Sequence, residues 1–401
     1  MTNTALPTYL LAVIGSISPC YWGSHIRYIY ISLLSGFWCF ACPIASYTKL
    51  SRLENSSNLL RRAIMKEAIV AQGPKVQIID SPIPKPTADQ LVIKVVVSGS
   101  NPKDWKLPQW RPDLVLNQGD DIAGIVHEVG ENVTEFKPGD RVAAFHEMMA
   151  PYGSYGEYAV AWQHTTFHIP KKTSFEEAAA IPLAAMTAAV GLYLRLGLPE
   201  PWNPATEPTP LVVYGAASAV GAYAVQLAQK SNIHPLICVA GNSVSHVEKL
   251  IDRSKGDTII DYRKGDDAVV EDLKKAAGNA RLLYAFDAVS EKNSYINLSK
   301  VLAEGSKITL VLPGKDYSQI PSHITQSTTN VGSVHNDSKD FGYVFFRYFG
   351  RGLQEGWFKA QPHVVVPGGL GGIQKALENL KAGKANAIKY VFRIADTEGI
   401  S

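Results

Sequence analysis

Cysteine is scarce in this sequence and almost absent from its main body. The 401 residues contain four cysteines, Cys20, Cys39, Cys42 and Cys238, and none lies between positions 43 and 237. This long stretch therefore has no disulfide framework, which is typical of a protein from a reducing compartment.

Charge of either sign is also limited. Charged residues make up 19% of the chain and the formal net charge is +3, while hydrophobic residues make up 46%. No dense stripe of lysine and arginine is present, so the composition argues against a nucleic-acid-binding protein and favours a globular one. The length is enough for two or three domains.

The N-terminal region is the part with the least charge. Residues 1–48 contain one formal charge, Arg27, and the segment 28–45 is about as long as a membrane span. Basic residues follow it, which would place the rest of the chain on the cytoplasmic side. Serine, glycine and proline interrupt the segment, and it lacks the charged start of a signal peptide. We therefore expect 1–64 to be an N-terminal extension, either non-native or an anchor through 28–45, and we expect a cytoplasmic protein.

From Met65 the sequence predicts two kinds of structure. Residues 65–190 begin with short β-strands separated by glycine and proline turns. They end in small and apolar residues at helical spacing, which start after a capping box at Ser174. A proline-rich loop at 199–210 leads to strands that alternate with helices until about residue 314, the pattern of a parallel sheet covered by helices. After a less regular stretch, strand-like residues return near the C-terminus and are expected to complete the first module.

The segment LVVYGAASAVGAY, residues 211–223, joins a buried strand to a helix through a turn of small residues. Backbone N–H groups at the start of such a helix point at an anion, and small side chains let a pyrophosphate approach. A tight turn in a core is the alternative. The alternating strands and helices around it favour a dinucleotide site formed by Ala217, Ser218, Ala219, Val220 and Gly221.

The end of the next strand indicates which dinucleotide binds. NAD-binding sheets usually place an acidic residue about 20 positions after the glycine turn, where it holds the ribose hydroxyls. This sequence has Gly241, Asn242 and Ser243 there, and no carboxylate before Glu248. Because an uncharged turn accepts a 2′-phosphate that an acid would repel, we expect NADP(H). Tyr262 is expected to contact the adenine or the phosphate, with capping of the core as the alternative.

From Met65 to Ile394 the chain resembles the medium-chain dehydrogenase/reductase superfamily. The resemblance rests on GDDIAGIVHEVG, FKPGDRV, GSYGEYAV, EEAAAIPLAAMTA, YGAASAVG and GKANAIKYVFRI. Within it, NPKDWK, VGSVH and PGGLGGIQKALENLKAGK resemble the fungal trans-enoyl reductases of polyketide pathways and their quinone oxidoreductase relatives. This resemblance implies an α/β fold. A GroES-like domain (65–190) would be completed by 341–401, with a Rossmann NADP-binding domain at 191–340.

The resemblance also bears on zinc. Many members bind a catalytic zinc through a cysteine and a Gly-His-Glu sequence, whereas the corresponding positions here are Asn101 and Gly119-Asp120-Asp121. A zinc site needs thiolates or imidazoles at close spacing, and the closely spaced cysteines of the structural zinc lobe are missing. We expect the protein to be zinc-independent, with no metal site.

The remaining candidate residues are implied by the resemblance. Lys106 is the candidate catalytic residue, a positive charge near the developing negative charge of the substrate; it could instead hold the cofactor or be a solvated lysine. The other expected cofactor contacts are Lys103, Asp104, Trp105, Leu312, Pro313, Ile388 and Lys389. The expected substrate contacts, which could equally be packing residues, are Ala188, Ala189, Leu192, Tyr193, Val331, Gly332, Ser333, Val334 and His335.

Reduction of an activated C=C bond by NADPH is the function that follows. We expect a trans-acting enoyl reductase of polyketide or other secondary metabolism, whose enoyl substrate is a small molecule or is bound to a polyketide synthase carrier protein. Two alternatives stay open, a freestanding quinone or enone oxidoreductase and a relative that binds NADPH without catalysis.

Overall fold

The computed structural model describes residues 64–400. The segment 28–45 and the rest of the expected extension before Ile64 lie outside the described residues. The described residues belong to one compact unit. Two main β-sheets organise its described part, one mixed and one entirely parallel.

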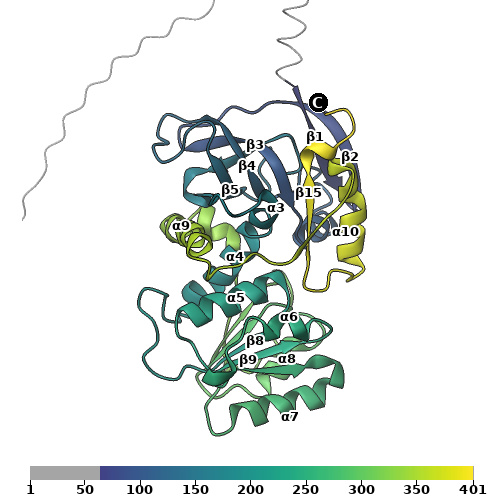
Figure 1. The fold of residues 1–401 in the computed structure, drawn as a ribbon. Coiled ribbons are helices and arrows are strands. Elements are labelled where there is room, and N and C mark those ends of the chain that lie inside the picture. The colour runs from purple at the N-terminus through teal and green to yellow at the C-terminus, as the bar shows by residue number, and fades with distance from the viewer. Residues whose placement is uncertain (1–63, 401) are drawn as a thin grey trace, which may run out of the picture. The chain divides into compact units, whose positions relative to one another are not determined.

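The mixed sheet has the strand order β14-β15-β3-β4-β5-β7, and β6 also pairs with β3. Its strands are β3 (Gln90–Gly99), β4 (Asp121–Val129), β5 (Arg141–Phe145), β6 (Tyr158–Trp162), β7 (Thr166–His168), β14 (His363–Val365) and β15 (Lys389–Arg393). The strand β15 pairs antiparallel with β3, so the C-terminal segment returns to the first module (Figure 1). A two-stranded hairpin, β1 (Ile64–Ala71) and β2 (Lys75–Pro82), lies beside it.

The parallel sheet has the strand order β10-β9-β8-β11-β12-β13. Its strands are β8 (Leu211–Tyr214), β9 (Leu236–Ala240), β10 (Thr258–Asp261), β11 (Tyr284–Asp287), β12 (Lys307–Leu310) and β13 (Thr325–Thr328). In chain order this is 3-2-1-4-5-6, the order of a dinucleotide-binding sheet, with the topological switch between β8 and β11. The predicted combination of a β-rich domain and a doubly wound parallel sheet is confirmed.

The helices cover both sheets. They are α2 (Lys103–Trp110), α3 (Phe175–Ala178), α4 (Pro182–Ala189), the π-helix η2 (Val190–Arg195), α5 (Ala219–Lys230), α6 (Val244–Glu248), α7 (Asp266–Ala277), α8 (Ser294–Ser299), α9 (Lys339–Glu355) and α10 (Ile373–Lys381). The yellow segment of Figure 1 shows α10 beside β2, where the two elements are in contact.

The capping box at Ser174 is confirmed, because its hydroxyl accepts from the N–H of Glu177 at 3.1 Å and its own N–H donates to that carboxylate at 2.8 Å. The helical pattern that follows it is interrupted after its first turn. The first turn, α3, ends at Ala178, and α4 begins at Pro182, because proline lacks the N–H that a continuing helix needs. The stretch 175–195 is long and apolar enough to cross a membrane, but most of it is buried within the fold.

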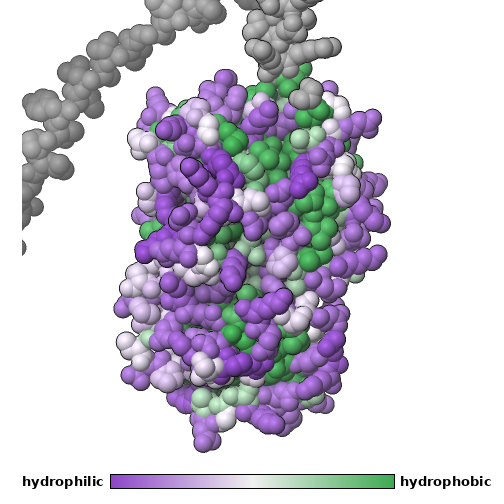
Figure 2. Space-filling model, viewed as in Figure 1, coloured by the Kyte–Doolittle hydropathy of each residue, from purple (hydrophilic) through white to green (hydrophobic). Residues whose placement is uncertain are grey.

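Two elements were not expected in the irregular stretch before residue 363. One is the edge strand β13, which is short and mostly exposed. The other is α9, a 17-residue helix. Its buried face, formed by Phe345, Phe346 and Phe349, packs on β7 and on the helix α4. Figure 2 shows a largely hydrophilic face, broken by hydrophobic patches over the C-terminal segment and over the parallel sheet.

Candidate cofactor and active site

The turn after β8 has the shape of a phosphate-binding loop. Gly215 has φ = +79°, a conformation that favours glycine. A Cβ on Gly221 would lie 2.3 Å from the carbonyl oxygen of Gly215, so only glycine lets the first turn of α5 pack this closely on the loop. A side chain at Gly215 or Gly221 would crowd this turn, so the two glycines keep it compact and open to a ligand. We call the turn from Gly215 to Gly221 the phosphate cradle.

The start of α5 supplies hydrogen-bond donors to this cradle. Ser218 is the N-cap, and its hydroxyl accepts from the N–H of Gly221 at 3.0 Å. Helix geometry leaves the N–H groups of Ala219 and Val220 without an intrahelical acceptor. These donors and the positive end of the helix suit a pyrophosphate, so the residues present fit a dinucleotide.

The end of β9 forms a second part of the site. A Cβ on Gly241 would lie 2.5 Å from the ring of Tyr262, so the ring packs directly on the glycine backbone. Tyr262 is 46% exposed, which rules out capping of the core as its role. The ring, Asn242 and Ser243 thus lie together at the carboxyl edge of the sheet, where the adenosine end of a dinucleotide binds.

Arg263 was not identified from the sequence, and it lies at this same place. Its guanidinium donates to Asn242 Oδ1 at 2.7 Å and pairs with Asp261 at 2.5 Å. The guanidinium also holds the pKa of the Asp261 carboxyl down at about 2. An arginine near the second strand is the residue that accommodates a 2′-phosphate. The sequence signal that could have identified it was a basic residue two positions after the strand β10. Its proximity to Asn242, however, depends on the pairing of β9 with β10.

The NPKDWK motif forms a buried polar network instead of an open surface. Lys103 Nζ pairs with Asp120 at 2.7 Å and donates to the carbonyl of Gln118 at 2.7 Å. Asp104 accepts from the hydroxyl of Tyr155 at 2.6 Å. Burial raises the pKa of Asp104 to about 7 and that of Asp120 to about 6. Burial lowers the pKa of Lys103, but the two carboxylates outweigh this effect and hold it above its usual value.

A second buried lysine completes the network. Lys389 Nζ contacts Asp121 at 2.5 Å and the side-chain carbonyl of Asn101 at 2.7 Å. Asp121 also accepts from the N–H of Leu183, which caps α4. Lys389 is 4% exposed, so its ammonium is buried and bound to partners within the protein. Contacts of Lys103, Asp104 and Lys389 with a cofactor stay predictions.

These lysines occupy the region where the superfamily resemblance would place a catalytic zinc. Among residues 64–400, no group of three His, Cys, Asp or Glu side chains could hold a metal ion. Zinc independence stays a prediction, and the paired ammonium groups of Lys103 and Lys389 are its structural support.

Lys106 is the lysine of the motif that lies outside this network. Its Nζ pairs with Glu291 Oε1 at 2.9 Å, and its side chain is 18% exposed. Glu291 belongs to the loop after β11, so the pair connects α2 with the carboxyl edge of the parallel sheet. The alternative of a freely solvated lysine does not hold. Trp105 is partly buried, and its indole N–H has no partner within the described residues.

The other predicted cofactor residues lie at the ends of strands. Leu312 and Pro313 lie just beyond the end of β12, at the same edge of the parallel sheet as the phosphate turn, and the carbonyl of Leu312 accepts from the hydroxyl of Tyr317. Ile388 precedes β15 and packs against the core of the mixed sheet. Whether these residues contact a cofactor stays a prediction.

The first group of predicted substrate residues lies in the core. Ala188, Ala189 and Leu192 are 0% exposed and Tyr193 is 5% exposed. The hydroxyl of Tyr193 donates within the fold, to Leu227 O at 3.2 Å, and its ring stacks on Phe345. This arrangement fits the packing role that the sequence left open, and substrate contact by these residues stays a prediction.

The second group is the 3-10 helix η5 (Val331–His335). Burial lowers the pKa of His335 to about 3, so the ring is neutral. His335 Nε2 lies 3.3 Å from the carbonyl of Phe145 and donates to it. Its Nδ1 and the hydroxyl of Ser333 are buried without a partner in the part of the chain that the structure describes. Val334 packs in the core, and Gly332 lies against Met148. Because two of its buried polar atoms have no partner, this helix is a better candidate for contact with the substrate than the first group.

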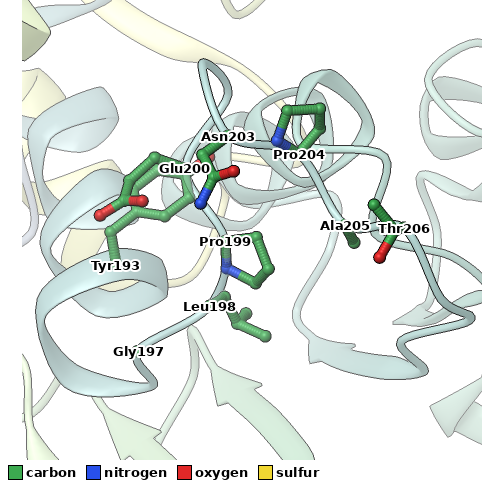
Figure 3. A pocket seen from close by; sticks show the side chains of 9 residues that line it. All are labelled: Tyr193, Gly197, Leu198, Pro199, Glu200, Asn203, Pro204, Ala205 and Thr206. Atoms are coloured by element: carbon green, nitrogen blue, oxygen red, sulfur yellow. The ribbon is translucent and has the colours of Figure 1, made fainter.

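A pocket of about 450 Å³ lies elsewhere (Figure 3). It is lined by Tyr193, Gly197, Leu198, Pro199, Glu200, Asn203, Pro204, Ala205 and Thr206. Lys307, the first residue of β12, donates to the carbonyl of Leu196 beside this pocket, so the pocket lies at the amino edge of the parallel sheet, opposite the phosphate turn. Of the predicted site residues, Tyr193 alone lines it.

Known proteins match both the fold and the sequence. A family model described as the alcohol dehydrogenase GroES-like domain matches residues 87–171. The quinone oxidoreductase from Coxiella burnetii superposes with a TM-score of 0.64 at 22% identity, over 82% of this chain and 99% of that one. CurK enoyl reductase superposes with a TM-score of 0.65 at 19% identity, over 82% and 98%. These structures show the shared fold.

Curated relatives narrow the family. Trans-enoyl reductase fsr4 of Gibberella fujikuroi is 56% identical over 317 residues, which are 78% of this chain and 94% of that protein. Trans-enoyl reductase resD of Aspergillus sclerotiorum is 30% identical over 81% of this chain and 98% of its own length. The chain therefore belongs to the trans-enoyl reductases, oxidoreductases of the medium-chain dehydrogenase/reductase superfamily, which uses a nicotinamide cofactor.

Proposed function

We propose that the protein uses NADPH to reduce an activated C=C bond in an enoyl chain carried by a polyketide synthase carrier protein. The phosphate cradle at Gly215–Gly221 is the observation that carries the proposal. The choice of NADPH over NADH is supported by the uncharged turn at Gly241–Ser243 and by Arg263 beside it. The enoyl substrate is proposed from the names of the relatives, and its attachment to a carrier protein from the family resemblance of the sequence.

Each part of the site has a task in binding. The N–H groups of Ala219 and Val220 would hold the pyrophosphate, and Tyr262 and Arg263 would hold the adenosine end with its 2′-phosphate. A nicotinamide dinucleotide bound there supplies the hydride that reduction of a C=C bond requires. The described residues provide its orientation at the carboxyl edge of the sheet.

Reduction also requires that the negative charge developing on the substrate be stabilised. Reduction of a conjugated C=C bond moves negative charge onto the carbonyl oxygen, and a positioned cation lowers the free energy of that state. Lys106 is the cation we assign, because its ion pair with Glu291 is partly exposed, whereas Lys103 and Lys389 are paired within the buried network. It would act through its charge from beside the cofactor, not by contact with the carbonyl oxygen. Lys103 and Lys389 instead orient α2 and β15, which keeps the Lys106 side chain at the edge of the parallel sheet.

The test is a panel of NADPH oxidation assays on the purified protein. We expect turnover with a crotonyl-type thioester, a lower rate with a quinone, and none without an acceptor. NADH should support the thioester reaction poorly. A quinone rate above the thioester rate would instead identify a freestanding quinone reductase, and binding of NADPH without turnover would identify a non-catalytic relative.

The carrier protein can be tested in the same assay. We expect a crotonyl group on a carrier protein to react with a lower KM than the same group on a small thiol, because the carrier adds binding contacts remote from the reacting carbons. Equal KM values would remove the carrier protein from the proposal. A cytoplasmic location also stays a prediction, and recovery of the full chain in the membrane fraction after a carbonate wash would contradict it.

A further inference from the structure

An ion pair crosses from the GroES-like domain to the Rossmann domain at the candidate site. Lys106 Nζ lies 2.9 Å from Glu291 Oε1, although the residues are 185 positions apart in the chain. Lys106 comes from α2, and Glu291 comes from the loop between β11 and α8. The carboxylate is 45% exposed and the lysine side chain 18% exposed, so the pair is accessible to a ligand.

The loop that carries Glu291 has an unusual backbone. Ser290, Lys292 and Asn293 have φ values of 57°, 49° and 63°, in the left-handed region that residues with a Cβ rarely adopt. Such conformations persist only where the surrounding structure enforces them, and they cluster at functional sites. Glu291 lies between two of these residues, so its position is set by the fold rather than by local preference.

Asp287 enforces this conformation. Its buried carboxylate accepts from the N–H groups of Val289 at 2.9 Å and Ser290 at 2.8 Å, and from the hydroxyl of Ser294 at 2.6 Å. The hydroxyl of Ser290 accepts in turn from the N–H of Val311 at 2.9 Å. The loop is therefore fixed to the ends of β11 and β12, and its shape does not depend on the ion pair.

The same loop touches the phosphate turn. The N–H of Ala288 donates to the carbonyl of Tyr214 at 3.0 Å. A Cβ on Gly215 would lie 2.6 Å from Val289. Glu291 is two residues further along, so its ion pair holds the Lys106 ammonium close to the phosphate turn.

We propose that Glu291 positions Lys106 for the cofactor, holding its ammonium at the edge of the sheet until a phosphate of the dinucleotide takes it over. A partly exposed ion pair is weak, whereas a lysine bound to a phosphate makes a stronger, charge-assisted contact. Lys106 therefore leaves Glu291 and binds the cofactor when the cofactor is present. Binding of the dinucleotide has to break the pair, so Glu291 lowers affinity and eases release. This inference rests on the proposed function.

A double-mutant cycle on NADPH binding tests the proposal. The dissociation constant is measured by fluorescence titration for the wild type, Glu291→Gln, Lys106→Ala and the double variant. Glu271→Gln is the matched control, because Glu271 is an exposed glutamate in α7 that pairs with Lys274. A thermal unfolding curve for each variant confirms that it is folded.

We expect Glu291→Gln to bind NADPH about two- to fivefold more tightly, the size of a partly exposed ion pair. Lys106→Ala should bind it about tenfold more weakly, and adding Glu291→Gln to that variant should change nothing further. The control should bind like the wild type.

Three results would overturn the inference. One is equal tightening by Glu291→Gln with and without Lys106, which would show a general effect of charge. Another is a Glu291→Gln variant that binds NADPH with the same affinity as a wild type that binds it well. That result would remove the role of Glu291 and leave the proposed function intact. Failure of the wild type to bind NADPH at all would remove the proposed function as well.

Discussion

Replacing Gly221 with alanine tests the phosphate cradle directly. The added Cβ would lie 2.3 Å from the carbonyl oxygen of Gly215 and 2.8 Å from the Cα of Ala216, both backbone atoms. Ordinary contacts begin near 3.4 Å, so the start of α5 has to move by about 1 Å. Overpacking of this kind costs about 1–3 kcal/mol of stability, and the better helix propensity of alanine offsets at most about 1 kcal/mol of it.

The effect on binding should be larger than the effect on stability. A hydrogen bond to a charged group contributes about 1.5–3 kcal/mol, and a 1 Å movement misaligns the N–H groups of Ala219 and Val220. Loss of one such bond predicts NADPH binding roughly 10- to 100-fold weaker. Fluorescence titration gives the dissociation constant, and thermal unfolding gives the stability.

Gly350→Ala is the matched control. Gly350 lies inside α9, and a Cβ there has its nearest neighbours at 3.4 Å, which is ordinary contact. This variant should bind NADPH like the wild type and be equally or more stable, by up to about 1 kcal/mol. If folded Gly221→Ala binds NADPH with wild-type affinity, the turn does not hold the pyrophosphate and the cofactor assignment fails.

Three further predictions concern the cofactor's phosphate and the buried network. Arg263→Ala should weaken NADPH binding about tenfold and leave NADH binding unchanged, because only NADPH carries the 2′-phosphate; equal losses for both cofactors would contradict this role. Lys389→Met should lower the free energy of unfolding by about 3–5 kcal/mol, since it leaves the Asp121 carboxylate buried without its counter-ion; urea unfolding measures it, and a loss below about 1 kcal/mol would refute the argument. The pKa of Asp104 is raised to about 7 by burial, so the folded state binds a proton more tightly than the unfolded one. Its contribution to stability is present near pH 4 and is lost as the pH rises to about 7, at up to about 1.4 kcal/mol per pH unit. Asp104→Asn should flatten this part of the stability profile, as urea unfolding at pH 5, 6 and 7 would show, and an unchanged slope would contradict the assignment.

Several features of the fold were predictable because they depend on neighbouring residues. The capping box at Ser174 needs a glutamate three residues later, and the phosphate turn needs two glycines between a buried strand and a helix. The uncharged turn at Gly241 is likewise visible as a missing carboxylate. Steric limits on the backbone and the period of apolar residues act over a few positions, so the sequence shows them directly.

The contacts that complete the site join residues far apart in the chain. Arg263 meets Asn242 because β10 pairs with β9. Lys389 meets Asp121, 268 positions away, because β15 returns to β3. Glu291 meets Lys106 only because the loop after β11 lies against α2. The sequence by itself determined the local turns, the caps and the type of cofactor site. Strand order and domain packing decided which charged side chains meet, because that depends on the burial of whole elements rather than on any local pattern.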